Sequence, residues 1–308
     1  MKKNKVLFIS DFTIDNLSNL FKKEPLLEEY EILDNPQGPV ISNLLNLDFE
    51  KINFCVVWTQ PSSVIPEFSD IIDMKNISIK ELFNSVDYYT NLLKNTAKKI
   101  GILLVPIWTN NPYQRGLGIN DLNEFGLSRT IMEMNHRLIN NLNDESNIFL
   151  LNANRWINMV GPKSYNPKLW YRGKILFNTE VFKQAYKEIL TVVNAAKGIS
   201  KKILLLDLDN TLWGGILGDD GIENLTLGGH NDLGEAYIDF QKSLLNLKRR
   251  GIILALVSKN DESIALHAVE NHPAMILKKD DFSSWRINWE DKAKNIKNAK
   301  KTLLKIFM

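Results

Sequence analysis

The stretch KILLLDLDNTLWGG, residues 202–215, decides the fold of the second half of this chain. It begins as an uninterrupted apolar run and ends in two aspartates, Asp207 and Asp209, separated by one leucine. A run without a polar face is typical of a strand inside a parallel sheet, so we predict a central strand here. Alternate residues of a strand point to the same side, about 7 Å apart. Both carboxylates are therefore expected to face one site at the carboxyl end of the strand, where open α/β sheets bind ligands.

Two crowded carboxylates raise each other's proton affinity unless a cation is present. A hard cation with oxygen ligands, such as Mg²⁺, relieves this repulsion. With the metal and a phosphate bound, one carboxylate can attack phosphorus while the other transfers protons. The alternative interpretation is that the two aspartates only cap a turn, as Asp often does.

Three further residues favour the catalytic interpretation. Thr211 follows the aspartates at a position where its hydroxyl could meet a phosphoryl oxygen. Ser258 ends the next predicted strand, so its hydroxyl is expected to point into the same crevice. Lys292 opens the last predicted helix, where its ammonium could neutralise phosphate charge.

Length and composition limit the class of protein. The 308 residues suggest two domains, and the net charge of +2 is too small to argue for a nucleic acid or an anionic membrane as partner. No apolar run reaches the roughly 18 residues that span a bilayer. The single cysteine, Cys55, excludes an internal disulfide and suggests a reducing, cytoplasmic setting.

Strands and helices alternate along the first half, which indicates an α/β fold with helices on both faces of a parallel sheet. A first domain is predicted at 1–198, with residues 157–178 as a long surface loop packed by aromatics and 197–202 as a linker. The predicted strands are 5–10, 29–36, 52–61, 102–108 and 147–156, and the predicted helices are 13–24, 41–49, 79–100, 122–143 and 179–197.

A second domain is predicted at 199–308. It also alternates strands with helices, and its last helix is basic. The predicted strands are 202–209, 252–261 and 274–282, and the predicted helices are 234–251, 262–273 and 289–307.

The stretch DLDNTLWGG (207–215) resembles the first motif, D-x-D-x-T, of the haloacid dehalogenase (HAD) superfamily, in the form found in FkbH-like proteins of HAD subfamily IIIC. WGGILGDDG (213–221), VSKND (257–261) and FSSWRINWEDKAKN (282–295) resemble the same family. LWYRGKILFN (169–178) and the strand-rich first half are similar to that family's SGNH-hydrolase-like N-terminal region. The resemblance implies two three-layer αβα domains: an SGNH- or flavodoxin-like parallel sheet, then a partial HAD-like Rossmannoid sheet.

The resemblance also implies roles for the site residues. Asp207 would be the nucleophile and a metal ligand. Asp209 would be the general acid/base and would lend its backbone carbonyl to Mg²⁺. Lys292 would balance charge on the nucleophile and the phosphate, and residues 213–221 would form a flap over the site. The implied phosphate- and substrate-binding residues are Thr211, Trp213, Gly214, Gly215, Ser258, Lys259 and Asn260.

Three functions follow from the resemblance and the residues. The first is Mg²⁺-dependent phosphoryl transfer of the FkbH-like kind, in which 1,3-bisphosphoglycerate is dephosphorylated and its glyceryl group passes to an acyl carrier protein. The second is a generic phosphatase acting on a phosphorylated small molecule. The third is a binding or assembly protein that has lost catalysis.

The chain departs from the family's pattern after Lys292. The resemblance implies a fourth strand ending in paired acids, but no acidic residue follows Lys292. Asp280 and Asp281 precede it, on the predicted third strand, and are expected to be solvated turn residues. We therefore expect a HAD-like domain that is incomplete at its C-terminus, with weak or no activity by itself.

The first domain is expected to be non-catalytic. Ser10 follows the first strand, but the glycine–aspartate–serine order of SGNH hydrolases is absent. The only histidine before residue 199 is His136, inside a predicted helix, so Ser10 lacks an evident base. Ser10, Asp11, Asn110 and Asn111 either line a remnant pocket or simply cap turns, and the second interpretation is the better supported.

Overall fold

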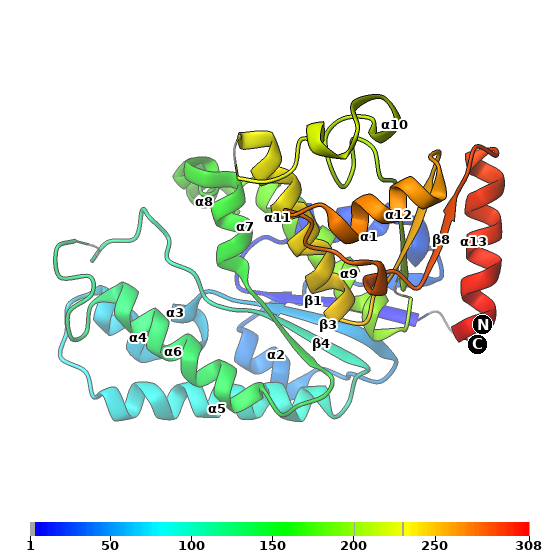
Figure 1. The fold of residues 1–308 in the computed structure, drawn as a ribbon. Coiled ribbons are helices and arrows are strands. Elements are labelled where there is room, and N and C mark those ends of the chain that lie inside the picture. The colour runs from blue at the N-terminus through cyan, green and yellow to red at the C-terminus, as the bar shows by residue number, and fades with distance from the viewer. Residues whose placement is uncertain (1–3, 117, 200, 230, 308) are drawn as a thin grey trace. The chain divides into compact units, whose positions relative to one another are not determined.

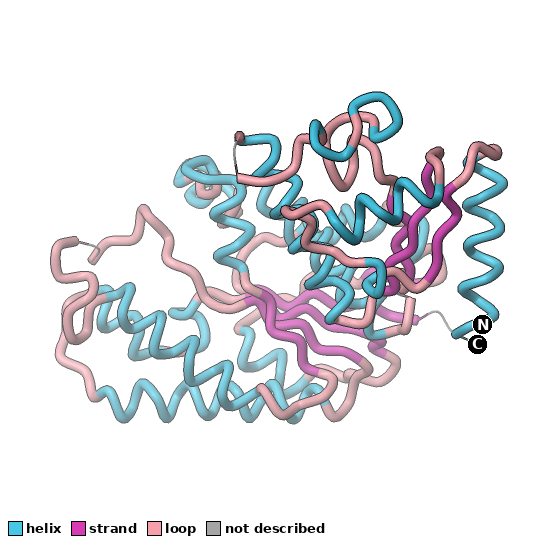
Figure 2. The backbone as a smooth tube through the Cα atoms, in the orientation of Figure 1, coloured by secondary structure: helices cyan, strands magenta, loops and turns pink. Residues whose placement is uncertain are grey.

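Two units make up the fold, residues 1–199 and residues 200–308. The computed structural model describes residues 4–116, 118–199, 201–229 and 231–307. Both units consist of parallel strands connected by helices, as the ribbon and the tube show (Figures 1 and 2). This is the α/β class that the alternating pattern predicts.

The first unit contains a five-stranded sheet with the order β2-β1-β3-β4-β5, and every neighbouring pair is parallel. The chain moves outward in one direction from β1 to β2 and in the other from β3 to β5, so the topological switch point lies between β1 and β3. The strands are β1 (Asn4–Ser10), β2 (Tyr30–Ile32), β3 (Ile52–Trp58), β4 (Ile102–Pro106) and β5 (Ile148–Leu151).

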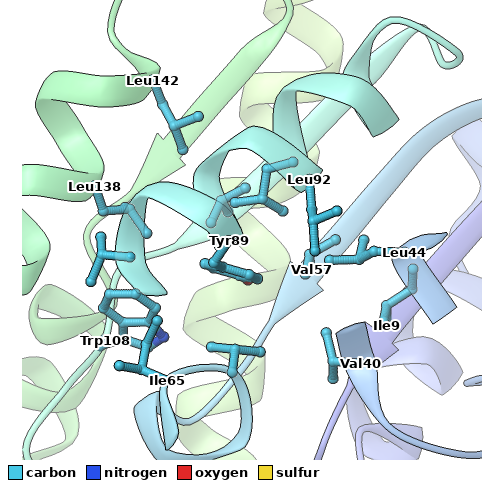
Figure 3. Close-up of a cluster of buried hydrophobic side chains, with 14 of the residues drawn as sticks. Ile9, Val40, Leu44, Val57, Ile65, Tyr89, Leu92, Trp108, Leu138 and Leu142 are labelled. Carbon is cyan, nitrogen blue, oxygen red and sulfur yellow. The ribbon is translucent and has the colours of Figure 1, made fainter. Parts of the chain in front are cut away.

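Helices cover both faces of this sheet (Figure 1). On one face, side chains of β1 and β3 such as Ile9 and Val57 pack with Leu44, Tyr89 and Leu92 from two helices (Figure 3). The helices on that face are α2 (Val40–Asn46), α4 (Pro66–Ile72), α5 (Ile79–Ala97) and α6 (Leu127–Leu142). On the opposite face lie α1 (Asp15–Lys22), α7 (Ala153–Val160) and α9 (Thr179–Ala196).

Two expectations for the first unit are wrong. The predicted strand 147–156 ends at Leu151, because Ala153 and Trp156 are buried on one side of α7, at helical rather than strand spacing. The predicted loop 157–178 contains α8 (Pro167–Gly173), which starts with proline as its first residue and with Asn166 accepting a hydrogen bond from the Lys168 N–H at 3.0 Å. The short helices α3 (Pro61–Val64) and α4 were not anticipated.

The second unit contains a three-stranded parallel sheet with the order β6-β7-β8. Its strands are β6 (Ile203–Leu206), β7 (Ile253–Ser258) and β8 (Ser284–Ile287). Helices α11 and α12 lie on one side of the sheet and α13 on the other (Figure 1). The helices are α10 (Leu217–Asp220), α11 (Asp232–Arg249), α12 (Glu262–Asn271) and α13 (Lys292–Phe307).

Two expectations for the second unit are also wrong. Among the described strands, β6 lies at an edge and β7 in the middle, and three of the four β6 residues are only half-buried. The third strand is 284–287 rather than 274–282. The apolar residues Met275 and Leu277 are buried as part of a loop, which the Asp281 carboxylate closes by accepting a hydrogen bond from the Lys278 N–H at 2.8 Å. Asp280 and Asp281 thus form a short 3₁₀ turn and not a strand.

The described helices give no candidate for a membrane span, since none combines the necessary length with sufficient hydrophobicity. Cys55 is fully buried in β3, and burial raises the pKa of its thiol. It therefore serves as a small apolar core residue.

Candidate active site

The two aspartates lie in the turn that follows β6 and not within the strand. Asp207 comes directly after the last strand residue, and Leu208 is fully buried. The Leu208 carbonyl accepts hydrogen bonds from the N–H groups of Thr211 and Leu212, at 3.1 and 2.9 Å, which closes a tight turn around Asp209. The two carboxylates therefore lie at the carboxyl end of β6, and the turn that follows the strand determines where they point.

Asp207 contacts the ammonium group of Lys292, the first residue of α13. Its other oxygen accepts a hydrogen bond from the Leu208 N–H at 2.9 Å. Burial is the largest influence on the Asp207 carboxyl and by itself raises its pKa. Hydrogen bonds from Lys292, Ser258 and the Leu208 N–H together outweigh burial and hold the pKa of Asp207 below its ordinary value.

Asp209 is held by three N–H donors, two from the flap and one from the turn after β7. Its Oδ1 accepts hydrogen bonds from Trp213 Nε1 at 3.0 Å and from the Leu217 backbone N–H at 3.1 Å. Its Oδ2 accepts one from Asn260 Nδ2 at 2.8 Å. A carboxylate can accept all three bonds at once. Asp209 thereby connects the turn after β6, the flap and the turn after β7.

Ser258 and Asn260 join the two aspartates. Ser258 ends β7 and is 1% exposed, and Asn260 follows it in the next turn at 4% exposure. The Ser258 hydroxyl hydrogen-bonds to Asp207, and Asn260 Nδ2 lies 3.4 Å from the Ser258 Oγ. Because β6 and β7 are parallel neighbours, their carboxyl ends meet at one edge of the sheet. A continuous polar chain thus runs from Lys292 through Asp207, Ser258 and Asn260 to Asp209.

The flap, residues 213–221, is fixed by backbone contacts of its first residues. Gly214 pairs with Thr226 through two backbone hydrogen bonds, and a Cβ atom at Gly214 would lie 3.0 Å from both Thr226 and Tyr237. Gly215 has φ +103°, a conformation that glycine adopts without strain, and its N–H donates to Asn210 Oδ1 at 3.1 Å. These contacts explain why two glycines follow the tryptophan.

The remaining predicted substrate-binding residues differ in accessibility. Trp213 is fully buried in the core, and its only polar atom already donates to Asp209, so its indole is not free to meet a phosphate. Lys259 is exposed beside the polar chain. Thr211 is half-buried, and its hydroxyl makes no hydrogen bond with the residues that the structure describes.

Two residues that sequence reasoning missed support Lys292. Asn288 follows β8, and its N–H donates to the Ser258 carbonyl at 3.2 Å. Its side-chain oxygen accepts from Asn295 Nδ2 at 2.6 Å, and Asn295 is 2% exposed on the first turns of α13. The two amides fix the start of α13 against the end of β7. Asn288 directly follows a strand and Ser258 ends one, and this position is the sequence feature that could have indicated its role.

The donor set fits a magnesium ion. The described residues contain no cluster of three or more His, Cys, Asp or Glu side chains that could hold a metal. Mg²⁺ needs fewer, because it is commonly bound through one or two carboxylates while water and substrate phosphate complete its shell. The Asp207 carboxylate and the Asp209 backbone carbonyl are the residues that would hold it.

The first-unit candidates mainly stabilise turns. Ser10 Oγ accepts a hydrogen bond from the Phe12 N–H at 3.2 Å, and Asn111 Oδ1 accepts one from the Tyr113 N–H at 3.0 Å. His136 is exposed on α6, where its Nε2 lies 3.1 Å from Asn140 Nδ2. The structure thus gives Ser10 no contact with a histidine among the described residues.

Comparison with known proteins identifies a structural relative of almost the entire chain. The crystal structure of the N-terminal part of the protein BF1531 from Bacteroides fragilis contains a phosphatase domain and is complexed with Mg. It matches with a TM-score of 0.85 and 25% sequence identity, over 98% of this chain and 81% of that chain. The chain therefore has the α/β fold of a HAD-like phosphatase, as the sequence predicts.

Other likenesses are looser. Axe2, an acetylxylan esterase from Geobacillus stearothermophilus, matches with a TM-score of 0.42 and 11% identity over 62% of this chain and 94% of that chain. LAE5, an alpha/beta hydrolase enzyme from the metagenome of Lake Arreo, Spain, matches with a TM-score of 0.39 and 12% identity over 64% of this chain and 95% of that chain. Scores this low do not establish a shared fold. No protein-family model and no curated protein matches the chain.

Replacing Lys292 with Met should raise the pKa of Asp207, because it removes the largest of the influences that oppose burial. In the wild-type protein the ionised Asp207 stabilises the folded state above the unfolded pKa of about 3.9, and this contribution is lost as the pH falls through the lower folded pKa. The variant should lose less stability on acidification. A carboxyl-carbon NMR titration, assigned with Asp207→Asn, measures the pKa directly.

The matched control is Lys294→Met, which removes an exposed lysine of α13 that pairs with Glu290, just before the helix, at 3.2 Å. It should leave the Asp207 titration unchanged. An unaltered Asp207 pKa in the Lys292→Met variant would contradict the assigned ion pair.

Proposed function

We propose that the chain is a Mg²⁺-dependent phosphatase of the HAD type, with Asp207 as nucleophile. The observation that carries this proposal is the chain of contacts linking Lys292, Asp207, Ser258, Asn260 and Asp209 at one edge of the second sheet. It combines a carboxylate kept ionised, a second carboxylate for proton transfer and a cation. The similarity, over 98% of this chain, to a magnesium-complexed structure that contains a phosphatase domain supports the same reaction class.

In the first half of the proposed reaction, an Asp207 oxygen attacks phosphorus and the bond from phosphorus to the leaving oxygen breaks. Asp209 gives its proton to that leaving oxygen. Lys292 keeps Asp207 ionised before the attack and offsets the negative charge that gathers there. The Ser258 and Thr211 hydroxyls are the candidate donors to the phosphoryl oxygens.

In the second half, Asp209 removes a proton from a water molecule whose oxygen attacks the phosphorus of the aspartyl phosphate. Inorganic phosphate leaves and the Asp207 carboxylate is restored. The three N–H donors on Asp209 fix the direction of its carboxyl group. Bound Mg²⁺ would contribute positive charge that screens the Asp207 carboxylate from the phosphate.

For the substrate, we favour the FkbH-like reaction: dephosphorylation of 1,3-bisphosphoglycerate with transfer of the glyceryl group to an acyl carrier protein. Its support is the family resemblance of residues 207–221, 257–261 and 282–295. A generic small-molecule phosphatase is the alternative, because the phosphatase site itself requires no carrier. An inactive binding or assembly protein is the third candidate.

We further propose that the first unit is an SGNH-hydrolase-like domain without hydrolase activity. The parallel sheet of order β2-β1-β3-β4-β5 supports the fold. The lack of activity is supported by the positions of Ser10 and His136, which lie far apart in the sequence, at the end of β1 and on α6. A serine without a neighbouring base has little nucleophilic power.

Asp207→Asn should reduce Mg²⁺-dependent phosphate release from p-nitrophenyl phosphate by at least about 10³-fold, because the nucleophile is removed. Asp280→Asn, which changes an exposed aspartate outside the polar chain, should retain full activity. Chelation of Mg²⁺ should abolish wild-type activity and its return should restore it. If the wild-type chain releases no phosphate with Mg²⁺ present, the inactive binding protein becomes the preferred interpretation.

Trp213→Phe should lower kcat by about tenfold with little change in KM, because it removes one hydrogen bond to a charged group and keeps an aromatic ring in the core. Trp285→Phe is the matched control, since the Trp285 Nε1 donates to Glu262 at 3.1 Å and has no contact with Asp209. Steady-state kinetics separate the two constants. An equal loss in both variants would mean that Trp213 acts through stability and not by positioning Asp209.

Glyceryl transfer should appear as a mass increase of a phosphopantetheine-bearing acyl carrier protein incubated with the chain and 1,3-bisphosphoglycerate. The adduct should be absent with Asp207→Asn. Phosphate release without any adduct would favour the generic phosphatase.

A further inference from the structure

A pair of adjoining cavities lies in the first unit, at the carboxyl ends of β3 and β4. The two strands are parallel neighbours, so the loops that follow Trp58 and Pro106 meet at the same edge. Tyr165 closes a third side, with its hydroxyl 2.9 Å from Thr109 Oγ1. The cavities have volumes of about 30 and 190 Å³ and share Asn111, Gln114, Tyr165 and Leu176 in their walls. We call them the amide cleft.

Aromatic side chains surround the larger cavity. Tyr113, Trp170 and Tyr171 line it, and the two tyrosines are 58% and 79% exposed. Single exposed aromatics are common, but two exposed tyrosines at one cavity give flat apolar faces that a ligand can cover. Trp170 is half-buried against the unit's core, and the Lys174 ammonium lies 4.8 Å from the centroid of its ring, so this side chain is a fixed part of the wall.

The polar groups of the cleft are neutral amides with unused bonding capacity. Asn111 and Gln114 are half-buried. Asn111 uses its oxygen to accept from the Tyr113 N–H, while its Nδ2 has no partner among the residues described. The Gln114 side chain makes no hydrogen bond within the described parts of the chain either. Each amide therefore offers donors to a ligand, and Gln114 offers an acceptor as well.

Charge is almost absent from the cleft. Among the wall residues described for the two cavities, Arg115 is the only one with a charged side chain. Its guanidinium donates two hydrogen bonds to Asp73, and these bonds lower the pKa of Asp73. Arg115 is thus engaged in an exposed ion pair with Asp73, so the described walls of the cleft offer no unpaired charge to a phosphate or carboxylate ligand.

We propose that the amide cleft binds a neutral saccharide. A sugar ring has apolar C–H faces that stack on tyrosine and tryptophan, and its hydroxyls both donate and accept hydrogen bonds, which matches the side-chain amides. A polyproline peptide would also stack on the aromatics, but its backbone has carbonyl acceptors and no N–H donors, so it satisfies only one end of the Gln114 amide. The site belongs to the first unit alone and does not depend on the phosphatase proposal.

Saturation-transfer NMR on the full chain tests the proposal. The probes are cellobiose, maltose, lactose and N,N′-diacetylchitobiose. Each is used at up to about 10 mM, so that Kd values near 1 mM are detected. At least one disaccharide should bind. Tyr171→Ala and Gln114→Leu should each weaken that binding by about tenfold. Tyr88→Ala removes a tyrosine that is 52% exposed on α5, away from the cleft, and should have no effect.

Asp207→Asn should bind the same disaccharide with unchanged affinity, which separates this test from the phosphatase reaction. Thermal unfolding of each variant shows that it is folded. The proposal is wrong if no disaccharide binds, if binding persists in both cleft variants, or if a polyproline peptide binds the cleft and the sugars do not.

Discussion

The contact between Asp207 and Lys292 is the interaction on which the proposed chemistry depends. The two residues are 85 positions apart, and parallel strands bring them together: β6 ends beside one and α13 begins at the other, after β8. Burial raises the pKa of Asp207, and only the hydrogen bonds to Lys292, Ser258 and the Leu208 N–H reverse that effect. Without the lysine, the protein would hold a half-buried acid with increased affinity for a proton, which is a poor nucleophile.

The neutral residues between the two aspartates solve a second electrostatic problem. Asp207 and Asp209 carry like charges, and Ser258 and Asn260 supply hydrogen-bond donors to each of them. Both of these residues are nearly fully buried, so their polar groups need partners and the aspartates provide them. Trp213 and Leu217 extend the same arrangement into the flap. Movement of the flap would therefore change the environment of Asp209 directly.

The first unit presents different chemistry at the corresponding edge of its own sheet. Its strand ends carry amides, hydroxyls and aromatic rings, and the one cation among the described cleft walls, Arg115, is paired with Asp73. Asp11 is half-buried just after β1, where burial raises its pKa and hydrogen bonds from Gln60 oppose that rise. The carboxyl ends of the parallel strands thus place charged groups at the candidate active site of the second unit and neutral polar groups at the cleft of the first.

Local patterns in the sequence determined the α/β class, most of the helices and the placement of Asp207, Ser258 and Lys292 at the ends of their elements, because periodicity and caps depend on near neighbours. Four features depended on tertiary structure. These are the edge position of β6, the third strand at 284–287, the helix beginning at Ala153 and the inward direction of Trp213. An apolar run gives the same signal in a central strand, an edge strand or a buried loop. Only packing against distant segments decides which of these forms. Packing also places the Trp213 side chain in the core, where its indole supports Asp209.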